Sequence, residues 1–384
     1  MQLNQTNIKT QQLPYDLNKL GTMLNEENIS WSFRNMKHIM PRQDIKAPAE
    51  KFHFQENKQH VYDIHYEVDG KLLSVGHFLQ KVFATGFLVI KDDKIVAEQY
   101  VNGYTEQSTA HSMSVAKSIV SALVGIAVDE GAINDIHDSV TKYLPELIGS
   151  GYDGTTVKNI LQMSSGVKFN EDYSDKDAEI HTFLIDIFGE KALPIQHYIE
   201  GLTKETNPGV FQYKSVDTQV LAMLIERATG RKLSAYLEEK IWQPLGMEHD
   251  AYWNTDLHGT PIAFAFVNAT LRDYAKIGRL YLNNGQWNGK KILSEQWIKA
   301  SIEPDRADLQ PGAAREFFGY GYQWWKPLGS DGTEFMARGI YGQHIFVNQR
   351  ENVIIVKSGV DPTIFSVHDY EAVLAYRAII NQLK

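Results

Sequence analysis

The stretch HSMSVAKSIVSALVGIAVDEG, residues 111–131, decides how the rest of the chain is interpreted. After Ser114 it is apolar almost all the way round a helix, which is typical of a helix buried inside a protein. Gly131 supplies a helix stop signal at its end. Lys117 follows Ser114 by one helical turn, so the two side chains lie on the same face of the predicted helix.

The Ser-x-x-Lys spacing suits nucleophilic catalysis, because a serine needs a nearby base and burial lowers the pKa of a lysine. This spacing occurs three times, at Ser114, Ser139 and Ser165. Only Ser114 opens a long buried helix, whereas the lysines of the other two stand in polar or loop-like sequence. The pattern therefore favours Ser114 as a nucleophile with Lys117 as its proton partner.

A second acid or base is needed to carry the proton to the leaving group. The pattern Tyr-x-Ser/Asn occurs four times, but only Tyr213 lies between a turn, Pro208-Gly209, and a new helix, VDTQVLAMLIERATG. We expect the turn to hold Tyr213 at the mouth of the helical region. A cationic Lys117 beside it would favour the phenolate, because an opposite charge stabilises the ionised form.

Strand-like sequence lies on both sides of a helical middle. FATGFLVIKDDKIVAEQYVNG, residues 83–103, predicts a β-hairpin that turns at Asp92-Asp93. RGIYGQHIFVNQRENVIIVKSG, residues 338–359, predicts a second hairpin that turns near 349–352, and EAVLAYRAIINQL closes the chain as a helix. We therefore predict an α/β fold of the α+β type, with one antiparallel sheet flanked by helices and an inserted all-helical domain.

Three regions follow from this pattern. Residues 1–75 are polar and predict an extended N-terminal arm. Residues 76–135 and 258–384 would form the sheet domain, and residues 136–257 the helical domain. The catalytic cleft would lie between these two domains.

Composition excludes several function classes. The 384 residues include 38 Lys and Arg against 47 Asp and Glu, a net charge of −9 with no basic stripe, which argues against nucleic-acid and membrane binding. The absence of cysteine removes disulfides and thiol nucleophiles. His53, His60 and His65 match no metal-ligand spacing, so no metal site is expected. The polar first twenty residues predict a soluble, cytoplasmic protein; a homodimer is compatible with the sequence, which carries no signal for oligomeric state.

The order of these motifs resembles that of the serine β-lactamases and penicillin-binding proteins. More closely, the chain is similar to the class C β-lactamase-related esterases and, among them, to the 6-aminohexanoate-dimer hydrolases, also called nylon-oligomer hydrolases. The matching stretches cover roughly residues 80–360 and are HSMSVAKS, YLPELIGSGYDG, NEDYSD, GVFQYKSVDTQVLAMLIERATG, QWW and GIYGQHIFV.

The resemblance implies catalytic roles for Ser114 as nucleophile, Lys117 as its proton partner and Tyr213 as general acid and base. It also implies that the backbone N–H of Ile340 joins that of Ser114 in an oxyanion hole. The family's Lys-Thr-Gly motif stands here as Ala337-Arg338-Gly339. Because the lysine that helps to hold a β-lactam carboxylate is missing, antibiotic hydrolysis is disfavoured.

The stretch NEDYSD, residues 170–175, is implied to contribute to substrate binding. Tyr173 is similar to a family tyrosine that closes over an amide substrate. Glu171, Asp172 and Asp175 would suit a substrate with a free amino group, or they form a solvated loop face.

Three further positions complete the implied substrate site. Ser215 is expected to support the catalytic tyrosine by hydrogen bonding. Trp325, with Trp324 before it, is expected to line the acyl pocket, although core packing is the alternative for both. His344 is expected at the edge of the cleft, without a role in proton transfer.

The sequence thus predicts a serine hydrolase that cleaves carboxylic esters or small linear amides through a Ser114 acyl-enzyme, with no metal or organic cofactor. One alternative is a penicillin-recognising D-aminopeptidase or carboxypeptidase, or a weak β-lactamase, with the same nucleophile. Another is a non-catalytic ligand-binding protein on the same fold. The presence of Ser114, Lys117 and Tyr213 together argues against this last alternative.

Overall fold

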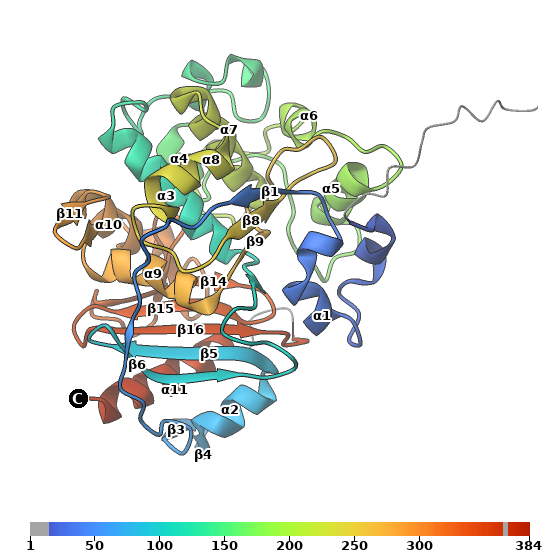
Figure 1. The fold of residues 1–384 in the computed structure, drawn as a ribbon. Helices are drawn as coiled ribbons and strands as arrows, with labels where there is room; N and C mark the ends of the chain where they lie inside the picture. The colour runs from blue at the N-terminus through green and yellow to red at the C-terminus, as the bar shows by residue number, and fades with distance from the viewer. Residues whose placement is uncertain (1–14, 364–367) are drawn as a thin grey trace, which may run out of the picture.

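The computed structural model describes residues 15–363 and 368–384. An eight-stranded sheet runs through the lower half of the molecule in Figure 1. Its strand order is β12-β13-β14-β15-β16-β5-β6-β2, and every pairing is antiparallel except that of β2 with β6. The strands are β12 (Phe318–Tyr320), β13 (Trp325–Pro327), β14 (Glu334–Gly339), β15 (Gln343–Asn348), β16 (Val353–Gly359), β5 (Ala84–Lys91), β6 (Lys94–Tyr100) and β2 (Gln55–Glu56).

Helices cover both faces of this sheet. Successive residues of a strand point to opposite faces, and over residues 87–90 of β5 both sets of side chains are apolar and buried. Phe87 and Val89 pack in one apolar cluster with α2 (Val75–Lys81) and α11 (Asp369–Gln382). Leu88 and Ile90 belong to the second cluster, with α3 (Val115–Asp129), α9 (Leu271–Leu282) and α10 (Glu295–Ile302). Figure 1 shows α11 and α9 on opposite sides of the sheet.

Apart from α1, the remaining helices lie above α3, away from the sheet, or to one side of it (Figure 1). They are α4 (Val157–Leu161), α5 (Glu179–Phe188), α6 (Ile195–Glu200), α7 (Ser215–Thr229) and α8 (Leu233–Leu237), which runs into a π-helical turn (Glu238–Trp242). Short 3-10 turns stand at Leu17–Thr22, Met36–His38, Val140–Lys142, Pro145–Leu147 and Ala307–Leu309.

A second sheet of four short strands was not predicted. Its order is β1 (Arg42–Ile45), β8 (Ala251–Asn254), β9 (Val267–Ala269) and β7 (Ala110–His111). Strands of two to four residues are too short to show the alternation on which the sequence prediction relied. Two small hairpins, β3 (His65–Val68) with β4 (Lys71–Ser74) and β10 (Gln286–Trp287) with β11 (Lys290–Lys291), complete the strands.

The structure confirms the predicted hairpins and the buried helix. β5 and β6 turn through Asp92 and Asp93, whose positive φ angles of 51° and 59° suit a two-residue hairpin turn. β15 and β16 turn through residues 349–352, and α3 occupies the predicted stretch. The fold is the predicted antiparallel sheet flanked by helices.

The N-terminal segment contributes to both sheets. From residue 15 it forms α1 (Ile29–Arg34), then β1 of the small sheet and β2 at the edge of the large one. The expectation of a soluble, cytoplasmic protein was drawn from the first twenty residues. Of these, residues 1–14 lie outside the described part of the chain. The division into an arm, a sheet domain and a helical domain stays a prediction.

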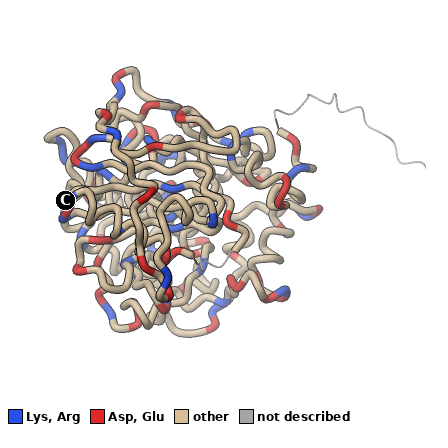
Figure 2. Tube along the Cα trace, turned by 90° about the horizontal axis from the view of Figure 1, so that it is seen from below, with Lys and Arg blue, Asp and Glu red and all other residues tan. Residues whose placement is uncertain are grey.

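Acidic and basic residues are interspersed along the chain (Figure 2). Within residues 15–363 and 368–384, no helix combines the length and the apolar character that a membrane span requires. Over the same residues, no group of three or more His, Asp or Glu side chains is placed to hold a metal ion.

Candidate active site

The start of α3 brings Ser114 and Lys117 into contact. Ser114 is the residue that precedes the helix, and the Lys117 Nζ donates to Ser114 Oγ at 2.9 Å and to the carbonyl oxygen of Phe264 at 2.9 Å. The Lys117 side chain is buried, and burial lowers its pKa to about 8, against the opposing effect of the Glu171 carboxylate. A lysine in this state can accept a proton near neutral pH.

Tyr213 lies against the same lysine. The Lys117 Nζ is 5.0 Å from the centroid of the Tyr213 ring. Burial, and after it the Glu171 carboxylate, raise the pKa of Tyr213 far above its ordinary value; the hydroxyl of Ser114 and the cations Arg338 and Arg315 lower it by less. The shift favours a neutral phenol at Tyr213 and not the expected phenolate, because the loss of water and the nearby carboxylate outweigh the cations.

Glu171 is the site residue whose position the sequence did not reveal. Its carboxylate accepts hydrogen bonds from the backbone N–H of Ser215, from Ser215 Oγ at 2.7 Å and from the Tyr173 hydroxyl at 3.3 Å. Ser215 thus donates to Glu171, and not to Tyr213 as predicted. The only sequence signal for this position of Glu171 is that it stands two residues before Tyr173.

The other two acids of the NEDYSD stretch behave differently from Glu171. Asp172 and Asp175 are exposed, and each accepts from a backbone N–H two residues further along its own loop. These short local bonds are typical of Asx turns. Glu171 is therefore the acid that the fold directs inward, onto Ser215 and near enough to Lys117 to act on its pKa.

Trp325 stacks on Tyr213, and its expected place in the acyl pocket stays a prediction. The two rings stack with their centroids 5.6 Å apart and an interplanar angle of 29°. The guanidinium carbon of Arg338 lies 4.7 Å from the centroid of the Trp325 ring. Arg338 Nε donates a hydrogen bond to the Asp369 carboxylate at 2.8 Å. Trp324 points elsewhere: it is fully buried, with its ring 4.2 Å from that of Tyr281, so it packs in the core.

The end of β14 approaches the nucleophile closely. A Cβ at Gly339 would stand 2.8 Å from the carbonyl oxygen of Ser112 and 2.9 Å from the backbone nitrogen of Ser114. Only glycine fits here without displacing the backbone. The strand thus carries the next residue, Ile340, to the neighbourhood of Ser114, as an oxyanion hole formed by these two residues would require.

The turn after Ile340 is fixed from the side of the sheet. Tyr341 and Gly342 both have positive φ angles, 62° and 81°. The buried Lys357 donates to the carbonyl oxygen of Gly342 at 2.7 Å, and Gln343 donates to that of Tyr341 at 3.2 Å.

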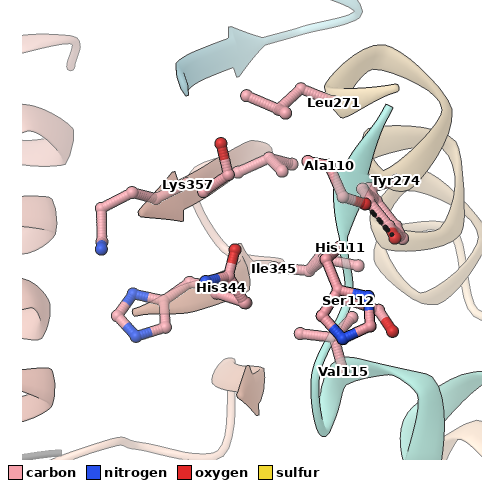
Figure 3. Close-up of a pocket in the computed structure, with 12 residues that line it drawn as sticks. Ala110, His111, Ser112, Val115, Leu271, Tyr274, His344, Ile345 and Lys357 are labelled. Atoms are coloured by element: carbon pink, nitrogen blue, oxygen red, sulfur yellow. Dashed lines mark hydrogen bonds between the residues drawn. The ribbon is translucent and has the colours of Figure 1, made fainter. Parts of the chain in front are cut away.

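His344 lies on the other side of β15. Its ring contacts the Tyr376 hydroxyl at 3.0 Å and Asp369 at 2.9 Å, and burial lowers its pKa to about 4. Figure 3 shows a small cavity lined by residues of β7, β15 and β16, with the His344 ring turned away from His111 and Ser112. The structure therefore does not bring His344 to the edge of the cleft, because strand alternation turns its side chain toward α11.

Residues 76–358 match the family model described as beta-lactamase. The chain belongs to the beta-lactamase family. It is 30% identical over 345 residues to a 6-aminohexanoate-dimer hydrolase of Paenarthrobacter ureafaciens, a match that covers 85% of this chain and 84% of that protein. As a member of this family, the protein is a serine hydrolase.

Two solved structures are similar to this one. A Bacillus anthracis protein, provisionally described as a 6-aminohexanoate-dimer hydrolase, superposes with a TM-score of 0.85 at 26% identity, covering 98% of both chains. A family VIII carboxylesterase superposes with a TM-score of 0.62 at 15% identity, over 79% of this chain and 93% of that one, which shows a shared fold.

The lowered pKa of Lys117 predicts how activity depends on pH. If the neutral amine is the base, kcat/KM rises with pH through about 8 and levels off above it, because deprotonation of Lys117 creates the active form. A pH–rate profile with an uncharged ester measures this. Lys117→Arg, which stays charged throughout, should abolish the rising limb. A profile that is flat between pH 6 and 9 in the wild type would contradict the assignment.

Proposed function

We propose that this protein cleaves carboxylic esters and small linear amides through an acyl-enzyme on Ser114. The observation that carries the proposal is the 2.9 Å contact between a buried, pKa-lowered Lys117 and the Ser114 hydroxyl. A serine becomes a nucleophile when a group beside it can take its proton.

Acylation follows from the states of these side chains. Neutral Lys117 takes the proton of Ser114 as Oγ attacks the carbonyl carbon, and the N–H groups of Ser114 and Ile340 stabilise the negative oxygen that forms. The neutral phenol of Tyr213 gives its proton to the leaving group as the scissile bond breaks, and the Lys117 ammonium restores the proton to Tyr213. The leaving group departs as an alcohol or an amine.

Deacylation repeats the relay with water. Water attacks the acyl carbonyl and loses its proton to the Lys117 and Tyr213 pair, and the proton returns to Ser114 Oγ as the acid is released. The proton count therefore balances over the cycle, and the enzyme ends in its starting state.

The substrate class is supported by two observations. The Paenarthrobacter relative is a 6-aminohexanoate-dimer hydrolase, and an amide bond is what joins one amino acid to another. The family resemblance places the lysine of Lys-Thr-Gly at the position of Ala337, which is fully buried and carries no charge for a β-lactam carboxylate. Esters and linear amides therefore fit this site better than β-lactams.

The nucleophile is tested by comparing Ser114→Ala with a matched control, Ser139→Ala. Ser139 has the same spacing to Lys142, but that lysine is half-exposed and pairs with Asp138 at 2.7 Å. Ser114→Ala should lower ester turnover by roughly four to six orders of magnitude and abolish labelling by a fluorophosphonate. Ser139→Ala should retain both.

Labelling that persists in Ser114→Ala would contradict the proposed nucleophile. An unlabelled, inactive wild type would instead favour the non-catalytic binding protein on the same fold.

Tyr173 is predicted to act selectively on amides. Burial raises its pKa well above the ordinary value, so the phenol stays protonated. Its hydrogen is donated to Glu171, and its oxygen can accept a hydrogen bond from the N–H of the leaving amine and hold that group in place. Amine departure needs such help more than alcohol departure does. Tyr173→Phe should thus lower kcat/KM for a linear amide by about 10-fold or more, with ester hydrolysis nearly unchanged.

Tyr143→Phe is the control for this experiment, because Tyr143 also bonds a carboxylate, Asp138 at 2.7 Å, at a distant helical turn. Equal losses of Tyr173→Phe on ester and amide would show that the Tyr173 hydroxyl has only a structural role.

A further inference from the structure

Helix α1 of the N-terminal segment packs against both backbone segments that carry the proposed oxyanion donors. One apolar cluster, separate from the two large cores, is formed by Ile29, Phe33, Met113, Tyr341 and Val360, with Ile340 packed against it. Met113 precedes Ser114, and Tyr341 follows Ile340. The cluster therefore joins the neighbours of both donors to two residues of α1.

Met113 and Tyr341 share an unusual backbone conformation. Their φ angles are +42° and +62°, in the left-handed region that favours glycine. A residue with a side chain stays in this region only where the surrounding structure holds it, and such positions are frequent at functional sites. Here the two strained residues flank the two N–H groups on which the proposed reaction depends.

Phe33 makes the contacts that hold these residues. Its side chain is almost fully buried, and its ring meets that of Tyr341 edge-on with centroids 5.4 Å apart. It also lies 5.1 Å from the ring of His111, two residues before Met113. Edge-to-face aromatic pairs add to the stabilisation that burial provides.

Helix α1 is itself anchored, so it can act as a support. The Arg34 guanidinium donates to the carbonyl oxygen of Asn102 at 2.9 Å, and Thr109 Oγ1 donates to that of Arg34 at 3.3 Å. The Tyr104 hydroxyl donates to the carbonyl oxygen of Ser30 at 3.2 Å. These bonds tie α1 to the segment that leads into β7 and the nucleophile.

We propose that Ile29 and Phe33 are positioning residues of the active site, which hold Met113 and Tyr341 so that the N–H groups of Ser114 and Ile340 converge on one point. The inference rests on the proposed function, since these groups serve as oxyanion donors only if acyl transfer takes place at Ser114. On this account the N-terminal segment is a part of the catalytic apparatus.

The test compares Phe33→Ala with Ile45→Ala in the full chain. Ile45 is a fully buried residue of the same segment, on β1, but it packs in the large core away from Met113 and Tyr341. Both variants are assayed with one ester at a temperature below both unfolding transitions. A second variant, Phe33→Leu, keeps most of the apolar volume if Phe33→Ala does not fold.

Phe33→Ala should lower kcat by about 10- to 100-fold, less than the complete loss of one donor, with KM little changed. Affinity for a boronic acid that forms a tetrahedral adduct should fall in parallel, whereas inhibition by the product acid should not. Phe33→Leu should recover most of kcat. Ile45→Ala should lower thermal stability but leave kcat and boronate affinity within about threefold, because it does not touch the donors.

Equal losses of kcat and boronate affinity in Phe33→Ala and Ile45→Ala, or unchanged values in both, would overturn the inference. Failure of the proposed function is recognised separately, by a wild type that a fluorophosphonate does not label. In that case the crystal structure of the Phe33 variant decides: displaced backbone nitrogens at Ser114 and Ile340 support the positioning role, and unmoved ones contradict it.

Discussion

The contact between Lys117 and Ser114 is the constraint on which the active site depends. Lys117 lies within a helix surrounded by core residues. Burying the charged form of an amine in an apolar interior costs free energy, so the ammonium form of Lys117 is destabilised. The same burial that penalises the ammonium lowers the pKa of Lys117, as the proposed base requires. It also raises the pKa of Tyr213, so in the proposed mechanism one environment prepares both a proton acceptor and a proton donor.

The surrounding elements cover α3, the helix that carries Lys117, on every side. The sheet lies below the helix and α7 packs against it from the helical region, so that little water reaches Lys117. The end of β14 then approaches the start of α3 so closely that glycine is required at position 339. The proposed nucleophile, its proposed base and the proposed donors of the oxyanion hole are thus brought together where a helix start meets a strand end.

Much of this architecture could be predicted from the sequence because it is encoded locally. The two hairpins carry turn residues between apolar strands, and α3 is apolar on all its faces. The Ser-x-x-Lys pair stands within one helical turn, so its geometry needs no tertiary information. The partner of Ser215, the position of His344 and the ionisation of Tyr213 were predicted wrongly, because each depends on which distant residues the fold brings near and on how much water it excludes.

The central claim, that Lys117 is a base prepared by burial, is tested most directly by NMR. The Cε and Nζ resonances of Lys117 in isotope-labelled wild-type protein, assigned by their absence from Lys117→Arg, can be followed as the pH is raised. The account predicts a titration midpoint near 8. A midpoint near 10.4, the value of a solvated lysine, would contradict it, since almost none of the amine would then be in the neutral form that accepts a proton near neutral pH.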